Sequence, residues 1–208
     1  MKSLSKYIVE QLTTYTNNVP SDILSIIKHL INNVDFKKLQ SIKGDDPDRF
    51  NKSKQNEQLF IDNFDNDDIK IFNTEEYYAL QNNSNNSSWE NLSDKEKSNF
   101  DTKYGDIILQ MNNKYIYIDL KISDKYLGAV SLGSLVNFDK NGYYICINSS
   151  NGKYNIVSHS SLVDAVKEYP ELLRPVINKQ YKGYPVEWEG QQLTSEYFIA
   201  GKDIEKFK

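Results

Sequence analysis

The sequence predicts an α/β domain that follows an N-terminal helical extension, and three observations support this fold class. The chain has 208 residues, of which 38% are hydrophobic and 12% aromatic, so it can bury a core large enough for one globular domain. Apolar residues recur at helical spacing through residues 1–43. Apolar runs typical of strands, joined by turn residues, follow after residue 106. Helices and strands are therefore both expected to contribute to the core.

Composition excludes several classes of protein. The net charge is -4, so no global basic field attracts nucleic acid, and local patches or metal ions would have to hold a polyanion. The single cysteine, Cys146, excludes an intramolecular disulfide, and its apolar run favours a buried thiol in a reducing compartment. No apolar run approaches the roughly 18 residues of a transmembrane helix, and no signal peptide is evident. We expect a cytoplasmic protein, and the abundance of Asn, Lys, Ile and Tyr suggests a bacterial or phage-infected cell.

Two helices are expected in residues 1–43, one on each side of Pro20. A turn at 44–47 then leads into a third helix, with Asp46 as its N-cap and Pro47 at its first position, running to about Asn63. The apolar stripes of the first two helices consist of Leu4, Ile8, Leu12 and Tyr15, and of Ile23, Ile26, Ile27, Leu30 and Ile31.

Glu57 lies on the apolar stripe of the third helix, because it precedes Phe60 and Ile61 by three and four positions and follows Phe50 by seven. A carboxylate on that side of a helix needs a partner. Two interpretations stay open: the side chain reaches out to water, or it points over the sheet towards acids of a later hairpin.

The segment between the third helix and that hairpin is expected to hold three elements. Residues 69–72 are consistent with a short strand, and the Asn/Ser tract 82–88 with a loop. Residues 89–100 are predicted to form a charged helix, in which Ser93 and Glu96 match a capping box.

The most informative stretch is a predicted β-hairpin at residues 104–122. Asn112 and Asn113 suit a two-residue turn, which places Asp106 opposite Asp119 on one face. Like charges that face each other are destabilising unless a cation lies between them, so the pair predicts a divalent metal site. Lys121 follows Asp119 by two residues and projects from the same face. Other acid-x-Lys matches in the chain lack this setting, for example Asp101-Thr102-Lys103.

A small-residue segment, 128–135, comes after the hairpin. It lacks the spacing of a P-loop, so nucleotide binding there is rejected. Ser131 and Ser134 could donate hydrogen bonds to a phosphodiester, although close helix packing is the favoured interpretation. Strands are then predicted at 143–148 and 154–158, followed by a helix that Ser160 or Ser161 caps and that Pro170 ends.

The last segment interleaves basic and aromatic residues in a way that can track a nucleic-acid backbone and stack on bases. Lys179, Tyr181 and Lys182 are the candidate contacts. The same mixture is also common in surface strands, so both interpretations remain.

These motifs together resemble the PD-(D/E)XK nuclease superfamily, which includes restriction endonucleases. The resemblance covers residues 47–168: an acid-bearing helix with Glu57, a hairpin with Asp106 and then Asp119-x-Lys121, and a helix with further strands. Gly105 stands where the family has proline, and Asp119 where Glu is more frequent. The resemblance implies a mixed central sheet with flanking helices and three regions: a helical extension (1–44), the nuclease-like core (45–168) and a tail packed on it (169–208).

The resemblance further implies Mg²⁺- or Mn²⁺-dependent hydrolysis of phosphodiester bonds in DNA. Asp106, Asp119 and Glu57 would be the metal ligands, since carboxylate oxygens suit Mg²⁺. Lys121 would position or help deprotonate the attacking water and stabilise the transition state. A homodimer is compatible with this class. The alternative is an inactive nuclease-like fold that serves as a nucleic-acid-binding or virion/assembly module.

Overall fold

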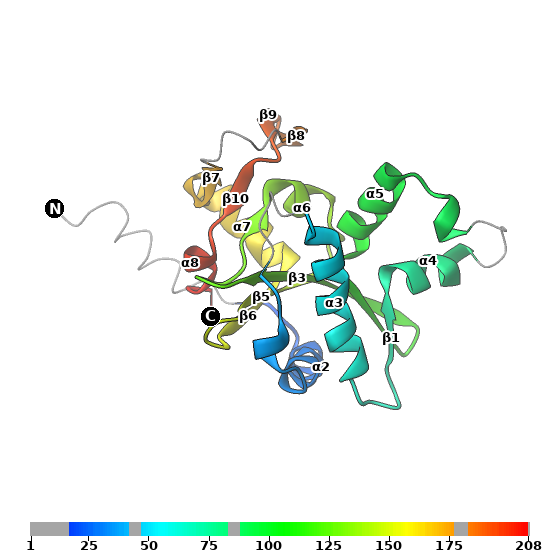
Figure 1. The fold of residues 1–208 in the computed structure, drawn as a ribbon. Coiled ribbons are helices and arrows are strands. Elements are labelled where there is room, and N and C mark those ends of the chain that lie inside the picture. Colours follow the sequence, from blue (N-terminus) through cyan, green and yellow to red (C-terminus); the bar gives the residue numbers. More distant parts are fainter. Residues whose placement is uncertain (1–16, 42–46, 83–87, 177–182, 208) are drawn as a thin grey trace.

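A five-stranded mixed sheet organises the protein (Figure 1). The computed structural model describes residues 17–41, 47–82, 88–176 and 183–207. Neighbouring strands are antiparallel except β3 and β5, which are parallel, and helices flank the sheet. The predicted fold class is therefore confirmed. In spatial order the strands are β1 (Lys70–Asn73), β2 (Ile107–Met111), β3 (Lys114–Ser123), β5 (Tyr143–Asn148) and β6 (Tyr154–Ser158).

Two apolar clusters cover the two faces of the sheet. Alternation along β5 sends Tyr144 and Cys146 into one cluster, and Ile145 and Ile147 into the other. Helices α2 (Ser21–Asn32) and α3 (Arg49–Asp62) supply the cluster that contains Ile145. The opposite cluster is built by α6 (Leu132–Asn137), α7 (His159–Glu168) and α8 (Gly201–Ile204). Cys146 is fully buried, as expected.

The remaining elements surround this arrangement. A three-stranded sheet, in the order β4-β10-β7, joins the segment after the hairpin to the C-terminal part of the chain, and β8 pairs with β9. These elements and the remaining helices are β4 (Val130–Ser131), β7 (Leu173–Pro175), β10 (Tyr197–Ile199), β8 (Pro185–Trp188), β9 (Gln191–Thr194), α4 (Thr74–Asn82), α5 (Asp94–Tyr104), η1 (Phe36–Lys38), η2 (Trp89–Asn91) and η3 (Pro170–Leu172).

The predicted hairpin is confirmed, and its predicted register holds from the pair Met111–Lys114 to the pair Ile107–Ile118. Met111 pairs with Lys114, and Asn112 and Asn113 form the turn with φ values of 47° and 62°. Two consecutive positive φ values match the twist of a two-residue turn to that of the strands, and asparagine tolerates this conformation better than most residues. The hairpin signal was strong because the turn and strand preferences are both local.

Several helix boundaries differ from the prediction. Helix α3 begins at Arg49 with Asp48 as its N-cap, and Pro47 lies in the preceding turn. Helix α7 begins at His159, because β6 leads into it without a loop; the N-cap is Ser158, whose side chain accepts from the Ser161 amide, and neither Ser160 nor Ser161 caps it. The helix predicted at 89–100 divides into η2 and α5, although its capping box is present.

Some predictions lie outside the described residues. They are the first N-terminal helix, the Asp46 cap and most of the Asn/Ser loop. Helix α4, which was not predicted, follows β1 directly and packs Tyr77 and Tyr78 against neighbouring aromatic rings. Within the described ranges, no helix combines the length and hydropathy that crossing a bilayer requires.

Candidate active site

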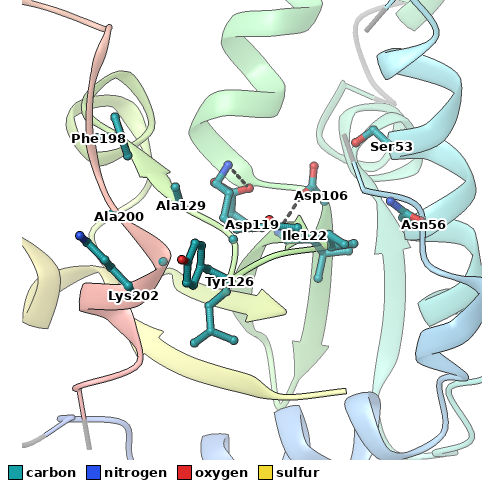
Figure 2. Close-up of a pocket in the computed structure, with 16 residues that line it drawn as sticks. Ser53, Asn56, Asp106, Asp119, Ile122, Tyr126, Ala129, Phe198, Ala200 and Lys202 are labelled. Carbon is teal, nitrogen blue, oxygen red and sulfur yellow. Dashed lines mark hydrogen bonds and ion pairs between the residues drawn. The ribbon is translucent and has the colours of Figure 1, made fainter. Parts of the chain in front are cut away.

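The acids of the hairpin line a cleft of about 690 Å³ (Figure 2). In Figure 2, Asp106 and Asp119 lie near the centre of the view, and Ser53 and Asn56 of α3 lie to one side of them. The full lining is Ser53, Asn56, Asp106, Asp119, Leu120, Lys121, Ile122, Ser123, Tyr126, Leu127, Gly128, Ala129, Phe198, Ala200, Gly201 and Lys202.

The backbone of the hairpin brings Asp106 to Asp119. The ladder ends at the pair Ile107–Ile118, and Asp106 is the residue just before it, while Asp119 follows Ile118 in β3. The Asp106 amide donates to the Ile118 carbonyl (2.8 Å), and the Leu120 amide donates to Asp106 Oδ2 (2.6 Å). These two bonds hold the Asp106 carboxylate next to the segment of β3 that carries Asp119, although the predicted pairing of Asp106 with Asp119 is not part of the ladder.

Gly105 sets the direction in which the chain enters this site. Its φ of 77° and ψ of -169° lie in a region open almost only to glycine. A Cβ at this position would lie 2.5 Å from the Ile118 carbonyl oxygen. Proline fixes φ near -65°, so this backbone path cannot accept the proline that the family pattern has here.

Asp119 is tied to two side chains. Its Oδ1 lies 2.7 Å from Lys121 Nζ, and its Oδ2 accepts a hydrogen bond from Ser134 Oγ on α6 (2.7 Å). Asp119 is 7% exposed, so these contacts are made largely out of water. The predicted neighbourhood of Asp119 and Lys121 on one face is confirmed.

The side chains of Ser131 and Ser134 both make hydrogen bonds within the protein that the sequence did not indicate. Ser134 lies behind Asp119, and the side chain of Ser131 caps α6 by accepting from the Ser134 amide (3.1 Å). Neither residue lines the cleft. Both hydroxyls thus support the site from within the protein. The other proposed nucleic-acid contacts, Lys179, Tyr181 and Lys182, lie outside the described residues.

Glu57 approaches the two acids without lining the cleft. It accepts a hydrogen bond from Ser53 Oγ (3.1 Å). Burial raises its pKa to about 7, against the opposing effect of the Ser53 hydrogen bond, and the negative charges of Asp101 and Asp119 add to the increase. Glu57 therefore lies within electrostatic range of Asp106 and Asp119.

The pKa values of Asp106 and Lys121 are both raised, which favours the neutral form of the acid and the charged form of the lysine. Burial raises the pKa of Asp106 well above its usual range, and the nearby charges of Asp119 and Glu57 raise it further. Burial alone would lower the pKa of Lys121, but Asp119 and Asp106 outweigh it and hold the pKa above its ordinary value. The site is therefore an acid-rich, desolvated pocket in which Lys121 carries the compensating positive charge.

Asp101 on α5 belongs to the same electrostatic neighbourhood and was missed. Burial raises its pKa to about 6, although a hydrogen bond with Thr74 opposes the increase, and its charge acts on Glu57. In the sequence it looks like the first residue of one more acid-x-Lys match. Only the folded structure brings its charge within range of Glu57.

The donor set suits a hard divalent cation. Asp106 and Asp119 supply carboxylate oxygens, and Mg²⁺ sites commonly use one or two carboxylates, with water and substrate phosphate as the other ligands. Among the described residues, no three His, Cys, Asp or Glu side chains converge into a ready metal-binding group. A metal at this site would therefore rest chiefly on the Asp106–Asp119 pair, and it would compete with Lys121 for Asp119. Comparisons with protein-family models, curated proteins and solved structures found no match to this chain.

Proposed function

We propose that this protein is a metal-dependent nuclease of the PD-(D/E)XK type that hydrolyses phosphodiester bonds in DNA. One observation carries the proposal: Asp106 and Asp119, which are close enough for the charge of one to act on the other, line one open cleft together with Lys121. A sheet gains nothing structurally from two neighbouring carboxylates. The order along the chain of an acid-bearing helix, the hairpin, a helix and a further strand adds support.

The charges in the cleft explain why a cation would bind. Burial disfavours ionisation of Asp106, and the charges of Asp119 and Glu57 add to that effect, so a divalent ion that binds Asp106 and Asp119 would relieve their repulsion. When bound there, Mg²⁺ would supply the positive charge that stabilises the phosphoryl group in the transition state and would make water more acidic.

The protein's own residues have separate roles. Asp106 and Asp119 hold the ion, and Ser134 keeps the Asp119 carboxylate in place by its 2.7 Å hydrogen bond. Lys121, whose pKa Asp119 and Asp106 raise against the effect of burial, carries the positive charge that stabilises negative charge on the phosphate and orients the attacking water. Glu57 is the nearby acid that can orient water or contribute a further ligand.

A second candidate is an inactive nuclease-like fold that acts as a nucleic-acid-binding or virion/assembly module. Both oxygens of Asp119 already have partners, Lys121 and Ser134, so the site is neutralised in part without metal. The net charge of -4 also gives no general attraction for DNA.

The test combines cleavage with metal binding. Linear, nicked, branched and single-stranded DNA are incubated with the protein in Mg²⁺ or Mn²⁺, and Mn²⁺ binding is measured by calorimetry. We expect Asp119→Asn and Asp106→Asn to lower cleavage at least about 10²-fold, a typical cost of losing one charge-stabilising group, and to abolish Mn²⁺ binding. The control is Asp124→Asn, an exposed acid just beyond β3.

The outcomes separate the two candidates. Cleavage that Asp119→Asn removes and Asp124→Asn leaves intact supports the nuclease. Intact DNA in every condition, together with Mn²⁺ affinity that neither active-site variant changes, contradicts it and favours the inactive module.

A further inference from the structure

The cleft extends well past the acids. Its second wall comes from the loop between β3 and β4 and from the junction of β10 with α8. Tyr126, Phe198 and Lys202 contribute side chains to this wall, and Figure 2 shows all three on the opposite side of Asp119 from Ser53 and Asn56. A volume of about 690 Å³ lies within the range of small-molecule sites and is far more than one ion needs.

Tyr126 presents an aromatic ring to this space. It is 57% exposed, and within the described part of the chain it makes no ring contact or side-chain hydrogen bond. The other large, exposed apolar side chains of the described residues, Phe50, Leu80, Val136 and Tyr184, do not line the cleft. An exposed ring at the mouth of an acidic, lysine-containing site is a surface on which a base can stack.

Lys202 adds a second positive charge at a distance from the first. Its side chain is exposed and lines the cleft, and no ion pair engages it within the described ranges. Lys121, by contrast, is held by Asp119. The Lys202 ammonium group is therefore suited to bind a phosphate one or more nucleotides away from the phosphate that is cleaved.

Two glycines fix this wall relative to the acids. A Cβ on Gly128 would overlap the backbone of Lys121, and a Cβ on Gly201 would overlap the backbone of Leu127. The β3–β4 loop is thereby packed against β3, and the residue before Lys202 is packed against the residue after Tyr126. Both side chains are therefore presented from backbone that is already in place, which lowers the entropy cost of binding.

We propose that Tyr126 and Lys202 form a nucleotide subsite, in which Tyr126 stacks on an unpaired base and Lys202 contacts a phosphate of the same strand. The subsite rests on the proposed nuclease function and narrows its substrate to single-stranded DNA or an unpaired end. In a duplex both faces of an interior base are already stacked, so the Tyr126 ring has no face to meet.

The experiment measures binding without cleavage. Fluorescence anisotropy of a labelled oligothymidylate of about 12 nucleotides, and of a duplex of equal length, is recorded in chelator with the full chain. We expect Tyr126→Ala to raise Kd for the single strand about 5- to 100-fold, and Tyr126→Phe to retain the affinity. Lys202→Gln should reduce the slope of log K against log salt by about 0.7.

Matched controls come from residues that do not line the cleft. Phe50 is another exposed aromatic residue, and Lys114 is an exposed lysine at the opposite end of β3. Phe50→Ala and Lys114→Gln should bind as the unmodified protein does. Equal Kd values for Tyr126→Ala and the unmodified protein, or duplex binding as tight as single-strand binding, would overturn the subsite.

The nuclease and the subsite can fail separately. Cleavage that depends on Asp119, with binding and cleavage both unchanged in Tyr126→Ala, overturns the subsite and leaves the nuclease standing. Binding that depends on Tyr126, with no cleavage in any metal, supports the subsite and refutes the nuclease.

Discussion

At the scale of single residues, Gly105 shows how one backbone conformation creates the site. Its positive φ turns the chain from α5 into β2 so that Asp106 follows at once in the cleft. The sequence identified the glycine only as a departure from a family pattern. Its reason is the close approach of the Ile118 carbonyl, which belongs to the partner strand and cannot be read from neighbouring residues.

Replacing this glycine should therefore be costly. Gly105→Ala combines backbone strain with a contact of 2.5 Å between the new Cβ and the Ile118 carbonyl oxygen, and we expect it to destabilise the protein by about 1–3 kcal/mol or more. Gly190 is a control for positive φ, since its φ is 75° but a Cβ added there would have no atom within 4 Å, so Gly190→Ala should cost only backbone strain. Urea unfolding of both variants measures the difference. Equal losses would show that the Ile118 contact is unimportant.

Glu57 is the residue whose charge state should make stability depend on pH. In the metal-free protein its pKa is raised from 4.5 to about 7, so the folded state holds a proton that the unfolded chain has already lost over that interval. Stability should therefore fall as pH rises from about 4.5 to about 7 and level off above, with a contribution of at most about 3 kcal/mol. Asp101 acts in the same direction over a lower interval, because its pKa is raised from 3.8 to about 6.

Glu57→Gln isolates this effect, because glutamine resembles the protonated acid. In chelator the variant should match the unmodified protein near pH 4 and exceed it near pH 8, as measured by urea unfolding across that range. Parallel stability profiles for the two proteins would show that Glu57 is not desolvated as the structure indicates.

At the scale of elements, the hairpin could be predicted and the support around it could not. Turn residues, strand alternation and register are set within a few positions of one another, so Asp106, Asp119 and Lys121 follow from the local sequence. Glu57 was reached by helical spacing alone, which indicated its side of α3 but not its Ser53 partner. Ser134 and Asp101 come from helices whose positions depend on tertiary packing, so no local pattern links them to the acids.

The contact between α6 and β3 gives a test of that support. Ser134→Ala removes the hydrogen bond to Asp119 Oδ2, and loss of such a supporting group commonly lowers metal affinity or activity about 10- to 100-fold. The control is Ser131→Ala, which removes the cap of the same helix and should cost about 1 kcal/mol of stability while sparing Mn²⁺ affinity. Calorimetric Mn²⁺ titration and thermal unfolding of both variants decide the matter. Unchanged Mn²⁺ affinity in Ser134→Ala would leave Ser134 as a packing residue.

At the scale of the whole molecule, the C-terminal segment packs back onto the α/β core. The resemblance implies a tail packed on the core, but the sequence could not show how the tail attaches. In the structure β10 pairs with β4 and β7, and α8 follows it into the apolar cluster on the α7 side of the sheet. These pairings join residues far apart in the chain, and strand propensity carries no information about such partners.

The packing of this C-terminal segment should contribute both to the stability of the whole protein and to the order of the cleft wall that carries Lys202. Phe207 is 2% exposed in the cluster, and Asn155 on β6 donates hydrogen bonds to the carbonyls of Ile204 (2.8 Å) and Phe207 (2.7 Å). Phe207→Ala should cost about 3–5 kcal/mol, because it leaves a cavity where the end of the chain is anchored. Phe207→Leu keeps most of the volume and should cost less.

The same change should weaken the second wall of the cleft before the rest of the protein unfolds. Lys202 lies in α8, between the Gly201–Leu127 contact and the Phe207 anchor, so loosening the anchor frees the segment that carries it. Hydrogen exchange in Phe207→Ala should therefore increase first at residues 200–207, while β2 and β3 remain protected. If exchange increased equally in β2 and β3, the hairpin that carries the acids and the C-terminal wall of the cleft would unfold together as one cooperative unit.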